Sequence, residues 1–115
     1  MTSFIPRIIP PPALQRPALW FTFQGVQILV RSEAGAASFP QIRHPQQLGL
    51  VPLREQYLGT LGDVHCFACE VEETEPPAGW MWSGLRGLFG VVDDALFALA
   101  GRAIQIMDWD RSHLY

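Results

Sequence analysis

Several features are missing from this 115-residue chain, and each absence excludes a class of protein. It contains no lysine, and its eight basic side chains, all arginine, face eleven acidic ones, giving a formal net charge of −3. Because the arginines form no basic cluster, we expect no nucleic-acid binding by this segment alone. No apolar run approaches the roughly 20 residues of a membrane span, and the Pro-rich start is unlike a signal peptide. We therefore expect a soluble, cytoplasmic protein with no membrane partner.

Cysteine is also scarce, since Cys66 and Cys69 are too few for a secreted disulfide framework. They form a Cys-x-x-Cys pair within "HCFAC", a spacing that can hold zinc or act as a redox pair. The surrounding apolar alternation is typical of a strand, on which residues three apart face opposite sides. We favour ordinary strand residues, with a small metal or redox protein as the less favoured alternative.

The usual catalytic motifs are absent as well. The stretch "GLRGLFG" lacks the Lys-Ser/Thr of a phosphate-binding loop, no "HExxH" occurs, and no serine has a nucleophile-elbow context. The acidic run "EVEETE" at 70–75 is interpreted as a solvated face rather than a cation site. Read by themselves, the residues offer no catalytic centre.

The first two thirds of the chain predict strands. Residues 1–17 carry five prolines and should form an extended arm. Apolar alternation around a Gln-Gly turn predicts a hairpin over 20–30, and a second hairpin around a Gly-Asp turn is predicted over 57–71. Residues 32–54 between them look loop-like, with room for a short strand or helical turn.

The last third predicts helices. A Pro- and Gly-rich linker at 74–80 precedes a short helix over 84–90, for which Ser83 is the predicted cap. A longer helix is predicted over 94–110, capped by Asp93. Strands first and helices after them indicate an α+β domain, with a small mixed or antiparallel sheet covered by C-terminal helices.

The long helix has two unlike faces when its residues are placed 100° apart. Arg102, Gln105 and Trp109 lie opposite the apolar arc. Trp109 therefore needs cover, either from a neighbouring loop such as the Pro-rich arm or from another domain or subunit. The core-facing arc comprises Leu96, Leu99, Ala100, Ala103, Ile104, Ile106 and Met107, with Phe97 at its edge.

The stretch "LRGLFGVVDDALFALAGRAIQIMDWDRSHLY" resembles the segment that leads into the zinc ribbon of bacterial NADH pyrophosphatases, which belong to the Nudix superfamily. The upstream "YLGTLGDVHCFACEVEE" is similar to the family's hairpin. The resemblance covers residues 18–115 and is strongest from residue 80 onward. The matching positions are Tyr57-Leu58-Gly59, Leu85-Arg86, Gly101-Arg102-Ala103, Trp109, His113 and Tyr115.

The resemblance implies that residues 18–115 form a degenerate Nudix-like N-terminal domain. In such enzymes a zinc ribbon and then a catalytic Nudix domain holding Mg²⁺ or Mn²⁺ follow. The enzymes split NAD(H) into nicotinamide mononucleotide and AMP, some remove NAD caps from RNA, and they are typically homodimers. This chain contains neither the Nudix box nor the four-cysteine ribbon, so the resemblance supplies no catalytic, cofactor-binding or metal-binding residue here.

We therefore expect a non-catalytic domain with a structural, docking or dimerisation role. It is expected to end at a domain junction and to contact the zinc ribbon and catalytic domain of a longer polypeptide. The residues expected to make those contacts are Arg102, Trp109, His113 and Tyr115. The alternative is a stand-alone protein-interaction module that uses the surface around Trp109.

Overall fold

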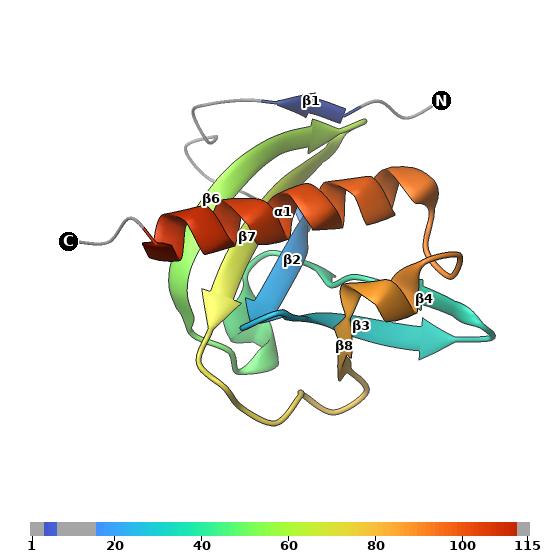
Figure 1. Cartoon of the computed structure of the whole chain (residues 1–115), viewed down its shortest axis with the longest axis horizontal. Helices are drawn as coiled ribbons and strands as arrows, with labels where there is room; N and C mark the ends of the chain where they lie inside the picture. Colours follow the sequence, from blue (N-terminus) through green and yellow to red (C-terminus); the bar gives the residue numbers. More distant parts are fainter. Residues whose placement is uncertain (1–3, 7–15, 113–115) are drawn as a thin grey trace.

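The computed structural model describes residues 4–6 and 16–112 (Figure 1). Within them, a mixed sheet of eight strands is crossed on one face by one α-helix, α1 (Asp94–Ser112). The predicted α+β class is confirmed. The shorter helix predicted over 84–90 is present as a 3₁₀ helix, η2 (Leu85–Leu88). None of the described helices is long and apolar enough to cross a membrane.

The first predicted hairpin is formed by β2 (Ala18–Gln24) and β3 (Gln27–Glu33). Its turn lies at Gly25-Val26, one residue later than predicted, and Gly25 takes a φ of 58°, which favours glycine. Alternation along β2 sends Leu19, Phe21 and Phe23 towards α1 and sends Trp20 and Thr22 to the other face.

The second predicted hairpin is also present, as β6 (Pro52–Leu61) and β7 (Val64–Val71) around the Gly62-Asp63 turn. β7 pairs in parallel with β2, which joins the two hairpins into a mixed sheet. Phe4–Pro6, from the segment expected to be an extended arm, form β1 and pair with β6. The sheet order is β1-β6-β7-β2-β3-β4.

The loop-like segment 32–54 contains more structure than its sequence indicates. It holds β4 (Ala36–Ser38), β5 (Gln41–Ile42), the 3₁₀ helix η1 (Pro45–Leu48) and the start of β6. β5 pairs with β2 at the sheet's middle, and β4 extends its edge beside β3.

The predicted helix caps have different outcomes. Ser83 lies in a strand, β8 (Met81–Gly84), and its hydroxyl donates to the Gly84 carbonyl, so its predicted capping role is wrong. Asp93 does cap α1, because its Oδ2 accepts the Ala95 amide at 3.1 Å. That interaction satisfies one of the unpaired donors of the first helical turn.

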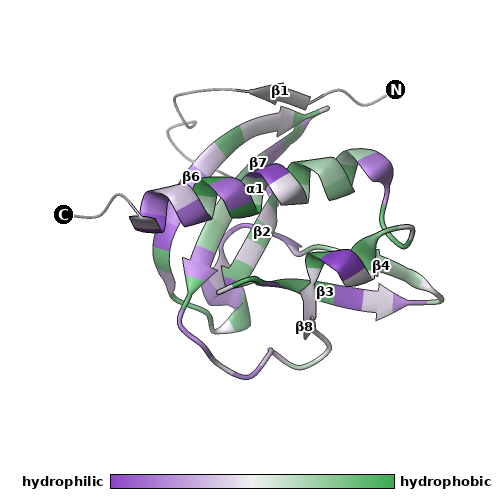
Figure 2. Cartoon of the chain, viewed as in Figure 1, coloured by the Kyte–Doolittle hydropathy of each residue, from purple (hydrophilic) through white to green (hydrophobic). Residues whose placement is uncertain are grey.

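The main core lies between α1 and the sheet. Figure 2 shows polar and apolar residues alternating along α1, as expected for a helix with one buried face. Leu99, Ala100, Ala103 and Met107 are buried, which confirms the predicted apolar arc. Two smaller clusters cover the opposite face of the sheet, one around Trp20 and one around Leu29.

Candidate interaction surface on the C-terminal helix

The outward side of α1 carries a regular stripe of residues. Ala95, Ala98, Arg102, Gln105 and Trp109 follow one another at alternating spacings of three and four, which places them on one side of a helix. All five are exposed, and the exposed fraction of Trp109 is 61%. The side chain of each residue is therefore presented away from the core that holds Met107.

The first half of this stripe is hollowed. A concave site of about 550 Å³ lies along the helix. Its small side chains leave room for a partner's backbone or side chain to approach the helix closely, while Arg102 adds a positive charge. Among the residues that the structure describes, Arg102 makes no ion pair. The lining residues are Ala95, Ala98, Leu99, Gly101, Arg102 and Gln105.

The structure thus brings together two of the four predicted contact residues. Arg102 lines the hollow, and Trp109 stands two turns further along the same stripe. His113 and Tyr115 lie outside the described residues, so the prediction for them stays a prediction.

A buried ionic cluster anchors the last turns of α1. Glu70, on β7, is only 5% exposed and lies on the face of the sheet that α1 covers. Arg54, its cross-strand partner on β6, donates to Glu70 Oε1 through Nη1. Arg111 Nε, from the end of α1, lies 3.6 Å from Glu70 Oε2. Arg54 Nε is also 3.8 Å from Asp110 Oδ2, so the cluster joins β6, β7 and α1.

This cluster corrects the interpretation of the acidic run at 70–75. Glu72, Glu73 and Glu75 are exposed, as expected, but Glu70 is not solvated. The strand alternation of β7 continues through Glu70 and places its carboxylate beneath α1, where two arginines compensate its charge. Glu70 therefore links the last turn of the helix that carries the exposed stripe to the sheet.

The two cysteines lie on opposite faces of β7, as predicted from their spacing. Cys66 packs in the core beneath α1, whereas Cys69 packs beside Trp20 and donates to Thr22 Oγ1. Burial raises the pKa of Cys66 to about 11 and that of Cys69 to about 12, from an ordinary value of 9.0. Both are neutral thiols near neutral pH, so neither is an activated nucleophile.

The two thiols make the fold sensitive to alkali. Well below pH 9.0 they are mostly neutral in both the folded and the unfolded chain. Above it the unfolded chain loses its thiol protons first, so the free energy of unfolding should fall as the pH rises towards about 11. Urea unfolding at about pH 8 and about pH 10.5 measures this fall, and the C66A/C69A double variant should show a shallower one. Equal falls in the two proteins would contradict the assignment.

No group of three His, Cys, Asp or Glu side chains gathers closely enough to hold a metal ion among residues 4–6 and 16–112.

Comparison with known protein families shows to which family the chain belongs. A model of the NADH pyrophosphatase-like rudimentary NUDIX domain matches residues 17–109. The chain belongs to this family. The family match covers the two hairpins and most of α1, including Arg102 and Trp109, and confirms the resemblance seen in the sequence.

A curated relative of this Nudix-like domain is the NAD-capped RNA hydrolase NudC of Deinococcus radiodurans. The two sequences are 48% identical over 58 residues, which make up 50% of this chain and 20% of NudC. The chain thus spans well under two thirds of the length of that relative. No solved structure matches the chain.

Proposed function

We propose that this domain is the non-catalytic N-terminal part of an NADH pyrophosphatase-like hydrolase. The observation that carries the proposal is the family match over residues 17–109. The whole enzyme would cleave the pyrophosphate of NAD(H) to nicotinamide mononucleotide and AMP. The relative is named for hydrolysis of NAD-capped RNA, which contains the same pyrophosphate group, so both substrates fit the proposal.

The side chains present support a non-catalytic role. Nudix-type hydrolysis needs several carboxylates that converge on a divalent cation. The chain contains no Arg-Glu-x-x-Glu-Glu sequence. The buried carboxylate that the structure describes, Glu70, is engaged by Arg54 and Arg111 and is not available to a cation. We therefore assign the Mg²⁺ or Mn²⁺ and the structural Zn²⁺ to the downstream parts of the enzyme.

The exposed stripe of α1 is the proposed docking face for the zinc ribbon and catalytic domain of the same polypeptide. An apolar side chain would enter the hollow beside Ala98, and a carboxylate would pair with Arg102. Trp109 supplies a large aromatic surface of the kind that dominates interfaces.

The proposed enzyme is a cytoplasmic homodimer whose subunits pair through other surfaces than this stripe. An antiparallel pair of α1 helices centred on the stripe would place Arg102 of one copy against Arg102 of the other. Like charges at a two-fold axis oppose association. A stand-alone interaction module remains the alternative function, because the same exposed Trp109 would suit a separate protein.

An activity assay tests the non-catalytic role. The purified chain is incubated with NADH, or with NAD-capped RNA, in the presence of Mg²⁺ or Mn²⁺, and AMP or decapped RNA is measured by chromatography. We expect no product above a protein-free control, since no carboxylate set that could hold the cation gathers within the described part of the chain. The NudC relative acting on NAD-capped RNA is the positive control. Robust turnover by this chain would refute the proposal.

A further inference from the structure

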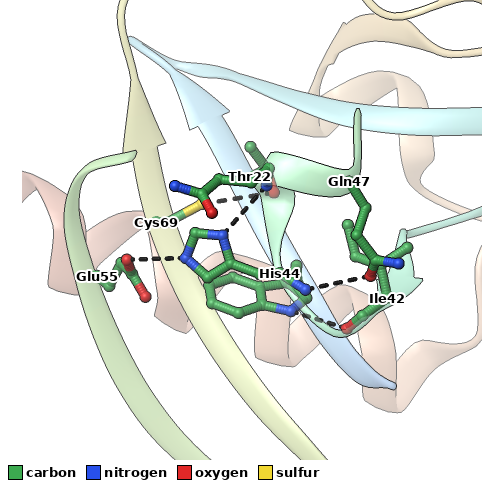
Figure 3. A network of polar contacts seen from close by, with 8 residues as sticks. Thr22, Ile42, His44, Gln47, Glu55 and Cys69 are labelled. Carbon is green, nitrogen blue, oxygen red and sulfur yellow. Dashed lines mark hydrogen bonds and ion pairs between the residues drawn. The ribbon is translucent and has the colours of Figure 1, made fainter. Parts of the chain in front are cut away.

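The sheet face opposite α1 carries a polar network centred on His44 (Figure 3). His44 immediately precedes η1, and its Nδ1 lies 3.1 Å from the backbone nitrogen of Gln46. Its Nε2 lies 3.2 Å from Glu55 Oε2 on β6. The edge of the ring rests on buried Trp20, with ring centroids 5.3 Å apart. Both ring nitrogens of His44 are thus engaged.

These contacts determine which ring nitrogen carries the proton when His44 is neutral. A backbone N–H can only donate, so Nδ1 must be the acceptor for Gln46 and carries no proton. The proton of a neutral imidazole is then on Nε2, where it is donated to the Glu55 carboxylate. The neutral Nε2–H form therefore satisfies the η1 cap and Glu55 together.

Protonation of His44 would break the contact with Gln46 and strengthen the contact with Glu55. A proton on Nδ1 would point at the Gln46 N–H, and the cap would be lost. The ion pair with Glu55 would meanwhile gain strength. Glu55, from β6, is the charged group that faces the ring, while Trp20 of β2 and Gln47 of η1 are uncharged and the Cys69 thiol of β7 stays neutral. Arg43 is adjacent in sequence.

The capped segment forms one wall of a cavity that opens to the surface and is lined by both apolar and polar residues. Gln47 Oε1 accepts the Arg43 amide at 2.6 Å, and the Leu50 amide donates to the Pro45 carbonyl at 3.2 Å, so the segment closes on itself. Leu50, which is 5% exposed, lines a cavity of about 300 Å³ together with Val71 on β7. Loosening of the cap would thus loosen a wall of this cavity.

We propose that His44 is a pH-responsive latch on residues 43–51. In its neutral form the ring caps η1 and holds the segment against β6 and β7. In its protonated form the ring stays with Glu55, releases Gln46, and lets the segment and the cavity wall open. The latch lies on the opposite face from the α1 stripe and does not depend on the proposed docking role.

Nitrogen-15 NMR of the whole chain between about pH 8 and pH 5 tests the latch. At the upper pH we expect the Nε2–H form of His44, detected from the ring nitrogens. As the ring takes up a proton, the Gln46 amide signal should shift with the same midpoint. The protection of the Leu50 amide against hydrogen exchange should fall about tenfold.

The matched variant is His44→Gln, whose side chain can accept and donate but does not titrate. It should abolish the pH dependence of the Gln46 and Leu50 amides. His65, whose Nδ1 lies 2.7 Å from the Tyr57 hydroxyl, is the internal control ring. An Nδ1–H form of His44 at the upper pH would overturn the proposal. The proposal would also be overturned if the Gln46 amide shift and the Leu50 exchange protection stayed constant while His44 took up its proton. Both quantities are measured in the unsubstituted chain, so this test does not require the variant to fold.

Discussion

Replacement of Glu70 by alanine should lower the free energy of unfolding by about 3 kcal/mol, because removal of one member of a buried ion cluster leaves the other charges uncompensated. Arg54 and Arg111 both approach this carboxylate, and their side chains are only 18% and 38% exposed. The loss should be accompanied by loosening of the last turns of α1, which Arg111 ties to the sheet. Urea unfolding measures the energy, and amide exchange in residues 108–112 measures the loosening.

Glu73→Ala is the matched control, since it removes an exposed glutamate from the same acidic run. It should change the free energy of unfolding by less than about 0.5 kcal/mol. The double variant R54M/E70L should recover part of the loss, because apolar residues of similar size can replace the buried Arg54–Glu70 pair, whereas Arg111 still loses its contact with Glu70. Equal losses for Glu70→Ala and Glu73→Ala would show that the cluster contributes nothing to stability.

Two substitutions on the exposed stripe should weaken docking without unfolding the domain. Trp109→Ala and Arg102→Glu should each weaken binding of the proposed partner domains by at least about tenfold, since truncated aromatic anchors and reversed charges are costly at interfaces. Arg102 is exposed and makes no ion pair among the described residues, so Arg102→Glu should leave the unfolding midpoint almost unchanged. Isothermal titration against the part of NudC that lies outside the matched segment measures the affinities.

Val26→Ala supplies the matched control for this series. Val26 is 73% exposed at the turn between β2 and β3, so its loss also removes exposed apolar surface. Its affinity for the NudC part should equal that of the unsubstituted chain. If all three variants bind equally well, the stripe is not the docking face.

The sequence predicted the parts of the fold whose signals are local and repeated. Alternation over six or more residues predicted the two hairpins, and the spacing of apolar residues with Asp93 at the start predicted α1. The same periodicity predicted the outward direction of Arg102 and Trp109. The exposure of Arg102 and Trp109 follows from the helix period alone, so it could be predicted without knowledge of tertiary contacts.

The short strands could not be predicted in the same way. β5 has two residues and β4 has three, and neither has an apolar alternation of its own. They are strands because β2 and β3 offer hydrogen-bonding partners beside them. The local sequence around Ser83 predicts a helix cap, but Ser83 lies in β8. The pairing of β8 with β3 is a long-range contact that outweighs the local preference.

Two polar centres were missed although the sequence contained a signal for each. Cys66, Ala68 and Glu70 occupy alternate positions of one strand, so all three side chains face α1. This alternation predicts that the Glu70 carboxylate is buried and requires a positively charged partner. His44 stands before a proline at the first helical position, with Gln47 three residues after His44, and this spacing is a capping box. Neither signal predicts the partner on β6, which is Arg54 for Glu70 and Glu55 for His44, because the register between strands does not follow from local sequence.

The most direct test of docking through the α1 stripe is a titration of nitrogen-15-labelled chain with the part of Deinococcus radiodurans NudC that lies outside the matched segment, observed through backbone amide signals. The docking account predicts that the largest shifts fall along Ala95, Ala98, Arg102, Gln105 and Trp109, while the amides around His44 on the opposite face stay unchanged. Shifts confined to that opposite face, or no binding at all, would contradict it.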